Sequence, residues 1–264
     1  MVDKDAVCEA IYNTNIAVTR ADGSKDVKKV FKAGYFILTS GKISPFYIDT
    51  RVLPASPGNY AVVLSELIGA AEEIVDTLGA NKKIIVSSES AGLAWGSPTA
   101  YELDLPWGFV RKDTPEFAGA VPENSVAIGV DDLITTMKTT SHLVNVVRTE
   151  GATINNVLVL VDRQEYKQAD AEKLGIKVNN LVTVDDLVAY GHNKGKLEPK
   201  LFDDIQAYKT DESQFAIRAL QGQTELLLKH SRWPKVRPFY EKEKNQAVLK
   251  AIDEILADSQ ISPS

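Results

Sequence analysis

Apolar residues in the middle of the chain alternate between helical spacing and short continuous runs. Between residues 59 and 78 they recur every three or four positions, which predicts an amphipathic helix, and Gly79 follows as a candidate C-cap. Four mostly apolar runs are typical of strands that are covered on both faces. These predicted strands are residues 83–86, 106–110, 126–130 and 157–161.

Helical segments separate the predicted strands. Residues 90–96 are small enough to let a helix pack close to a sheet, and apolar positions within residues 143–147 mark a helix that ends before Gly151. A repeated strand–helix–strand order with apolar strands implies a parallel sheet with right-handed crossovers and helices on both faces. We therefore predict an α/β fold with a doubly wound, mainly parallel sheet.

The character of the chain changes near residue 209, after which helical patterns dominate. Apolar residues recur on one face between residues 247 and 256, so this end is expected to pack on the core or on a partner subunit. We predict a domain of residues 1–208 and a helical C-terminal extension of residues 209–264. Within the extension, residues 230–238 form a basic, aromatic, proline-containing connector, interpreted as a solvated linker rather than an RNA-binding patch.

Composition narrows the range of functions. The 264 residues carry a net charge of −6, which argues against a protein that coats nucleic acid or binds acidic lipid surfaces. Cys8 is the only cysteine and there are three histidines, so neither an internal disulfide nor a zinc site is expected. The first residues lack an apolar signal core, and no stretch approaches the roughly 18 apolar residues of a membrane span. We expect a cytoplasmic protein.

Two adjacent carboxylates stand where the predicted strand of residues 126–130 ends. Asp131 and Asp132 are followed by the hydroxyl-rich loop of residues 135–140 and then by an amphipathic stretch. In an open α/β sheet, ligands bind beyond the carboxyl ends of the strands, and the start of a following helix offers free N–H groups to an anion. The layout suits a phosphorylated sugar. The carboxylates would accept hydrogen bonds from its hydroxyl groups, and the loop would bind its phosphate. A helix N-cap beside a solvated acid is the alternative interpretation.

Further segments make this interpretation more specific. Residues 36–49 (FILTSGKISPFYID) place a turn between two aromatic-rich runs, and residues 161–165 (VDRQE) place Arg163 at the end of the most continuously apolar strand. Residues 110–112 (VRK) and 130–136 (VDDLITT) complete a set of four short motifs. The set and its order resemble the orotate phosphoribosyltransferase family of type I phosphoribosyltransferases, over residues 31–190.

The resemblance implies a fold, a reaction and partners. The fold would be the type I phosphoribosyltransferase sheet with an N-terminal hood segment. The reaction would join orotate to the phosphoribosyl group of phosphoribosyl pyrophosphate (PRPP), giving orotidine monophosphate and pyrophosphate in pyrimidine biosynthesis. Mg²⁺ would be bound mainly through PRPP or pyrophosphate, with no metal site of the protein's own. The protein would be a cytoplasmic homodimer that binds PRPP and orotate or a related acidic base, but neither nucleic acid nor membrane.

The resemblance also implies residue roles. Asp131 and Asp132 would hold the ribose hydroxyls. Arg111 and Lys112 would stand at the base of a mobile loop that neutralises pyrophosphate in an active site shared by two subunits, and these four residues form the implied catalytic set. The implied substrate-binding residues are Thr135, Thr136, Lys138, Thr139 and Thr140 around the 5′-phosphate, Phe46 and Tyr47 around the pyrimidine, Arg163 on the orotate carboxylate, and Ser40 in the turn. Core packing is the alternative for the two aromatic residues, and a salt bridge at the sheet edge is the alternative for Arg163.

The chain departs from the family pattern at several cationic positions. Family lysines are replaced by Thr39 and Ala91, and a lysine and a histidine of the mobile loop are replaced by Pro115 and Phe117. Met137 and Lys138 occupy a stretch where the phosphate loop usually has glycine, and a left-handed backbone there would strain Met137. Each preorganised charge-stabilising donor is typically worth ~3–4 kcal/mol in the transition state, so several losses together can remove useful turnover.

Three hypotheses about function follow. An active orotate phosphoribosyltransferase with a divergent set of cations is favoured. The others are a phosphoribosyltransferase that acts on another base or acid, and a non-catalytic relative that senses PRPP or a nucleotide. Outside the family, a response-regulator-like domain also carries acids at strand ends, but it needs a separate phosphorylatable aspartate and a late lysine, and the chain offers no convincing set.

Overall fold

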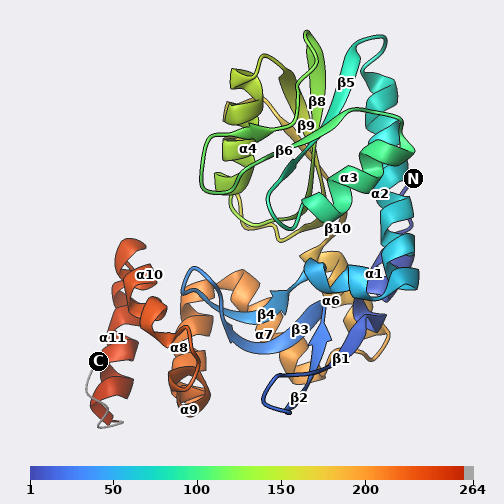
Figure 1. The fold of residues 1–264 in the computed structure, drawn as a ribbon. Coiled ribbons are helices and arrows are strands. Elements are labelled where there is room, and N and C mark those ends of the chain that lie inside the picture. Colours follow the sequence, from blue (N-terminus) through green and yellow to red (C-terminus); the bar gives the residue numbers. More distant parts are fainter. Residues whose placement is uncertain (259–264) are drawn as a thin grey trace. The chain divides into compact units, whose positions relative to one another are not determined.

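The computed structural model describes residues 1–258 of the chain. They form two compact units (Figure 1). The first unit contains Met1–Val30 and Thr50–Tyr190, and the second contains Phe31–Asp49 and the chain from Gly191 onward. The polypeptide therefore leaves the first unit to build part of the second, returns, and leaves it again.

A six-stranded sheet forms the centre of the first unit, in the order β10-β9-β8-β5-β6-β7. Its strands are β5 (Lys82–Ser88), β6 (Trp107–Val110), β7 (Phe117–Ala118), β8 (Ser125–Ile134), β9 (Thr153–Asp162) and β10 (Lys177–Thr183). All neighbours pair in parallel except β7, which pairs antiparallel with β6. The predicted doubly wound, mainly parallel sheet is confirmed.

Strand β8 is longer than the sequence pattern predicted. The apolar run ends at Val130, yet the strand continues to Ile134 because Leu133 pairs with Val161 and Ile134 with Asp162 of β9. The expectation that the acid pair follows the strand is therefore corrected. Asp131 and Asp132 lie among its last four residues, on backbone that the ladder with β9 holds in place.

Helices cover both faces of this sheet, with α4 on one side and α2 and α3 on the other (Figure 1). The helical segments are α1 (Lys4–Asn13), η1 (Thr50–Ala55), α2 (Pro57–Thr77), α3 (Leu93–Glu102), α4 (Met137–Thr149), α5 (Gln168–Leu174) and the start of α6 (Val184–Asn193). A separate hairpin joins β1 (Asn15–Thr19) to β2 (Lys25–Lys29). The predicted helix of residues 59–78 corresponds to α2, and Gly79 follows it with a φ of 62°, as a C-terminal glycine should.

One part of the core of the first unit lies between α4 and the sheet. Leu143, Val144 and Val147 of α4 are buried against strand residues such as Ile154 and Val159. Each such side chain contributes about 1.5–3 kcal/mol by leaving water. This packing holds the start of α4 beside the carboxyl end of β8. Within residues 1–258, no helix is long and apolar enough to cross a membrane.

The second unit consists of a hairpin and a set of helices. The hairpin is β3 (Phe31–Ile37) with β4 (Ile43–Ile48), and the helical segments are α7 (Pro199–Thr210), α8 (Glu212–Gly222), α9 (Thr224–Leu228), η2 (Trp233–Lys235), α10 (Val236–Lys242) and α11 (Gln246–Asp258). The apolar face predicted between residues 247 and 256 is buried, as shown by Val248 and Ile252. The division of the chain at residue 208 into a domain and an extension stays a prediction.

Aromatic packing joins this hairpin to the helices. Phe46 of β4 stacks on Phe31 and meets Tyr208 of α7 edge-on, and Tyr208 in turn meets Phe215 of α8. The hairpin turn fits closely against η2, since a Cβ added to Gly41 would lie 2.1 Å from the carbonyl oxygen of Lys235. Gly41 has a φ of 100°, so this turn needs glycine for its backbone and for its close approach.

Candidate active site

The acid pair at the end of β8 is built into the first unit. Asp131 is 8% exposed, and its Oδ1 accepts a 2.9 Å hydrogen bond from the backbone N–H of Asp132. The hydroxyl of Thr50, at the start of η1, donates a 2.5 Å hydrogen bond to Oδ2 of Asp132. Both carboxyl groups are therefore held by specific partners.

Burial changes the electrostatics of this pair. The pKa of Asp131 is raised well above 3.8, first by burial and then by the charge of Asp132. Burial also raises the pKa of Asp132, although the hydrogen bond from Thr50 opposes that effect. Adjacent buried carboxyls resist double ionisation. Ligand hydroxyl groups that donate to the pair would relieve this cost.

The loop between β5 and α3 passes close to the acid pair because it has a glycine, Gly92, at the point of contact. A Cβ at this position would lie 2.7 Å from Oδ1 of Asp131 and 2.8 Å from the carbonyl oxygen of Ser88. Glycine is therefore required where this loop passes the carboxylate. Ala91, which replaces a family lysine, precedes this point of contact.

The predicted phosphate loop leads into α4. Thr136 is its N-cap, with extended backbone and no side-chain hydrogen bond to the first turn. Lys138 and Thr139 are exposed in that turn, whereas Met137 and Thr140 are buried. The first-turn amides and the helix dipole make this terminus suited to an anion. The described residues with left-handed backbone do not include Met137 or Lys138, so the strain foreseen for a non-glycine residue does not arise.

The turn between β6 and β7 carries Arg111 and Lys112. The backbone N–H of Arg111 donates a 3.0 Å hydrogen bond to the carbonyl oxygen of Glu116 and so closes the turn. The side chains of Arg111 and Glu116 form a 3.3 Å ion pair. The Nε2 atom of His142, from α4, lies 3.0 Å from the carbonyl oxygen of Arg111 and 3.2 Å from that of Thr114. His142 thus links this turn to α4, and the mobility of the turn stays a prediction.

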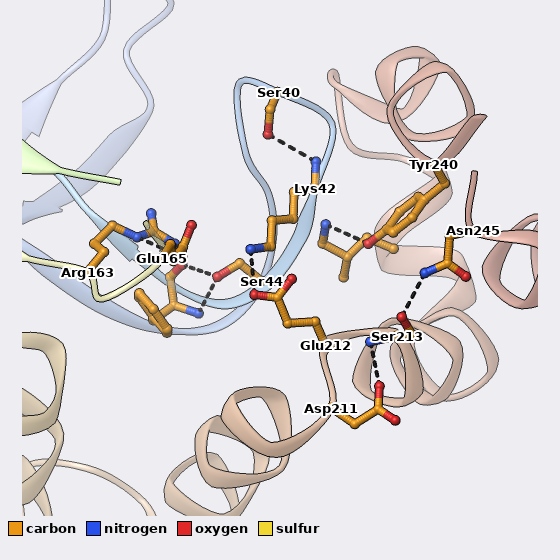
Figure 2. A network of polar contacts seen from close by, with 12 residues as sticks. Ser40, Lys42, Ser44, Arg163, Glu165, Asp211, Glu212, Ser213, Tyr240 and Asn245 are labelled. Atoms are coloured by element: carbon orange, nitrogen blue, oxygen red, sulfur yellow. Dashed lines mark hydrogen bonds and ion pairs between the residues drawn. The ribbon is translucent and has the colours of Figure 1, made fainter. Parts of the chain in front are cut away.

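Arg163 lies at the end of β9 and is buried, with its side chain 5% exposed. Its Nη2 and Nε atoms donate to Oε1 of Glu165 at 2.7 and 3.1 Å (Figure 2). The neighbouring Asp162 accepts a hydrogen bond from the backbone N–H of Gln164, and burial raises its pKa. The guanidinium that was assigned to a substrate carboxylate is already paired with a carboxylate of the chain.

The remaining predicted substrate-binding residues belong to the second unit. Phe46 is 1% exposed and lies in the aromatic core, while Tyr47 is half-exposed and Ser40 is exposed in the turn. Their roles stay predictions, although the burial of Phe46 matches the core alternative. Lys42 follows the same turn, and its ammonium group forms a 2.8 Å ion pair with Glu212 (Figure 2).

The structure brings the acid pair, the loop of residues 135–140 and Arg163 together at the end of neighbouring strands β8 and β9. It adds three residues that the sequence analysis missed: Thr50, Gly92 and His142. His142 had one available signal, because it stands four residues after Lys138 and so shares a face of α4 with it. Neither Thr50 nor Gly92 stands near the acid pair in the sequence.

No protein-family model matches the chain. It is 35% identical to an orotate phosphoribosyltransferase of Staphylothermus marinus over 162 residues, which are 59% of this chain and 76% of that protein. It is 31% identical to that of Acinetobacter baumannii over 199 residues, covering 68% of this chain and 88% of the relative.

Solved structures agree in fold. The crystal structure of orotate phosphoribosyltransferase from Aeropyrum pernix has a TM-score of 0.55 and 25% identity, covering 72% of this chain and 99% of that chain. UMP synthase of Leishmania donovani has a TM-score of 0.64 and 22% identity, covering 78% of this chain but only 42% of that chain. With its sheet, its acid pair and these relatives, the chain belongs to the orotate phosphoribosyltransferase family.

Proposed function

We propose that this protein is an orotate phosphoribosyltransferase, which transfers the phosphoribosyl group of PRPP to orotate and releases pyrophosphate. The observation that carries the proposal is the pair formed by buried Asp131 and half-buried Asp132 at the end of β8, next to the start of α4. Relatives at 31–35% identity that carry the name of this activity support it.

The geometry suits a ribose 5-phosphate group. The vicinal hydroxyls of ribose can donate to Asp131 and Asp132, and the 5′-phosphate can accept from the first-turn amides of α4 and the hydroxyls of the loop before it. Displacement at the anomeric carbon develops positive charge on the sugar, which nearby carboxylates stabilise. The chain therefore positions and stabilises charge, and needs no nucleophilic side chain.

Departing pyrophosphate needs cations, and three residues of the first unit are proposed to supply them. Arg111 and Lys112 stand in the β6–β7 turn, and Lys138 shares its face of α4 with His142, which contacts that turn. From this shared face we infer that Lys138 lies on the side of α4 that faces Arg111. These three residues would supply positive charge from positions other than those of the replaced family lysines.

Magnesium is proposed to arrive with PRPP. Among residues 1–258 no group of three or more histidine, cysteine, aspartate or glutamate side chains could hold a metal ion. Mg²⁺ commonly keeps its waters and binds substrate phosphates with one or two carboxylates at most, so the residues fit an ion carried by the pyrophosphate. When bound, it supplies charge neutralisation. Homodimeric assembly and a cytoplasmic location stay predictions.

The state of the cationic positions favours a second candidate function. Arg111 is already paired with Glu116 and its turn is attached to His142, while Thr39, Ala91, Pro115 and Phe117 lack the charge of the family residues. A protein with these features can bind PRPP through the acid pair and α4 without turnover.

The test mixes the protein with Mg²⁺, PRPP and orotate and follows the loss of orotate absorbance. We expect orotate consumption that depends on PRPP and that is lost in Asp132→Asn. Failure to exceed the uncatalysed rate overturns the transferase proposal. Calorimetry with Mg²⁺ and PRPP alone then separates a PRPP-binding protein, which releases heat with a defined affinity, from a chain that binds neither substrate.

A further inference from the structure

The end of strand β5 lies beside the acid pair, within the first unit. The ladder between β5 and β8 ends where Ser87 pairs with Val130. Ser88 and Asp131 are therefore the next residues along the two neighbouring strands. Val86, two residues before Ser88, is buried in the core cluster that includes α4. Because side chains alternate between the two faces of a strand, Ser88 and Asp131 share the face of the sheet that α4 covers.

The space beside Gly92 shows how close these two residues lie. A Cβ on Gly92 would be 2.7 Å from Oδ1 of Asp131, 2.8 Å from the carbonyl oxygen of Ser88 and 3.2 Å from the backbone nitrogen of Ser88. The carboxylate and Ser88 thus border the same small space. The side chain of Ser88 also lies near enough to Asp131 to lower the pKa of that carboxyl, against the larger effect of burial.

The hydroxyl of Ser88 is buried without a partner. Ser88 is 6% exposed, and its Oγ forms no hydrogen bond of normal length and direction within residues 1–258. Two nearby hydroxyls differ in this respect. That of Ser87 accepts from Nε1 of Trp107 at 3.2 Å, and that of Thr50 donates to Asp132. A buried hydroxyl without a partner costs free energy, which a bound ligand can recover.

The chemistry of the two groups selects the kind of ligand atom that fits between them. The carboxylate of Asp131 accepts hydrogen bonds, whereas the hydroxyl of Ser88 can donate one. A ligand hydroxyl group has one hydrogen to donate and lone pairs that accept, so it can bind both residues at once. A phosphate oxygen only accepts, and its charge would face the charge of the carboxylate. The pair therefore matches a sugar hydroxyl rather than a phosphate.

We propose that Ser88 is a specificity-determining residue of the sugar site, whose hydroxyl donates to the same ribose hydroxyl group that donates to Asp131. The inference rests on the proposed function and extends it. None of the site residues predicted from the sequence belongs to β5. Ser88 would make recognition of the ribose depend on two neighbouring strands, β5 and β8.

The test measures the affinities of PRPP, ribose 5-phosphate and pyrophosphate by calorimetry, each with Mg²⁺. Pyrophosphate is the ligand without a ribose. We expect Ser88→Ala to weaken PRPP and ribose 5-phosphate by the same factor, about tenfold, and to leave pyrophosphate unchanged. Ser88→Cys nearly keeps the volume of the side chain but is a weak donor, so most of the loss should remain. If ribose 5-phosphate binds too weakly to measure, the comparison of PRPP with pyrophosphate decides.

Ser125→Ala is the matched control. Ser125 is the first residue of β8, is 2% exposed and also carries a hydroxyl that has no partner within residues 1–258. It stands at the amino end of the strand, away from the acid pair, so all three affinities should stay unchanged. Since neither hydroxyl bonds to the described chain, the melting temperature should be kept or raised in both alanine variants.

Other outcomes overturn the inference. A loss that includes pyrophosphate, at an unchanged melting temperature, means that Ser88 binds pyrophosphate oxygens. The same loss with a lower melting temperature means that Ser88 holds the free site together, and three unchanged affinities mean that it contacts no ligand. An equal loss in Ser125→Ala means that the effect is not local. Failure of the unaltered protein to consume orotate overturns the proposed function, whereas normal consumption with unchanged affinities in Ser88→Ala overturns this inference alone.

Discussion

Thr50 and Asp132 are joined by a 2.5 Å hydrogen bond across 82 residues of sequence. Thr50 is 1% exposed, so its hydroxyl is directed to the carboxylate rather than to water. A donor on a buried carboxylate favours the ionised form. Thr50 therefore makes Asp132 the more readily ionised member of a pair in which Asp131 has lost most of its solvation.

Thr50→Val should weaken PRPP binding and change its pH dependence. Without the donor the pKa of Asp132 rises further, so the acid-side loss of PRPP affinity should move to higher pH, with about a tenfold loss at mid-range pH. Calorimetry over a pH series measures both effects, and Thr50→Ser should restore them. Thr99→Val is the matched control, because Thr99 is equally buried but donates to the carbonyl oxygen of Trp95. An unshifted pH profile in Thr50→Val would contradict the role of Thr50.

The acid pair should lower the stability of the protein as pH rises. Unfolded aspartate titrates near 3.8, whereas the native pair titrates higher, so between these values the native state binds more protons than the unfolded state. Stability contributed by the pair is complete below 3.8 and falls as pH rises towards the native pKa values. Asp131→Asn should remove this loss and raise the free energy of unfolding by about 0.5–2 kcal/mol at neutral pH, while weakening PRPP binding.

Denaturant unfolding at several pH values measures that change as the difference between variant and unaltered protein. The exposed Asp104→Asn controls for the loss of one negative charge. A stability difference that stays constant with pH would show that the pair does not titrate as described.

Gly92→Ala should abolish tight PRPP binding without unfolding the protein. The added methyl would lie 2.7 Å from Oδ1 of Asp131, so the carboxylate or the loop must move. We expect at least a tenfold loss of PRPP affinity, since small displacements of positioning groups are costly. Gly69→Ala, in α2 with nothing within 4 Å of the added atom, should leave binding intact and stabilise the helix by about 0.5–1 kcal/mol.

His142→Ala should release the β6–β7 turn from α4. The variant loses the contacts of Nε2 with the carbonyl oxygens of Arg111 and Thr114, so amide hydrogen exchange should speed up in residues 111–116 and little elsewhere. Mass-spectrometric exchange measures this by peptide. His192→Ala, which removes a ring that stacks on Phe202, is the control. Unchanged exchange in the turn would mean that the β6–β7 pairing alone holds it.

Local patterns in the sequence were sufficient for four strands of the sheet and for part of the site, but β7 and β10 were not predicted. Continuous apolar runs mark strands with two covered faces, so residues 126–130 and 157–161 could be placed in β8 and β9 without a structure. The acid pair could be placed because parallel strands bring their carboxyl ends to one edge. The same pattern predicts too early an end for β8. Leu133 and Ile134 belong to the strand because they pair with β9, and this pairing with a neighbouring strand does not appear in the hydrophobic pattern.

By itself, the sequence determined the order of the four central strands and the helices between them, the position of the acid pair and the family, because these follow from periodicity and from short motifs. Only the tertiary structure decided which partners those groups have. The hydroxyl of Thr50 donates to Asp132, and Arg163 donates to Glu165. Arg232 donates to the carbonyl oxygen of Ile37, which is 195 residues away in the sequence. Such contacts depend on how separate elements pack against each other. The spacing of residues along one element does not predict that packing.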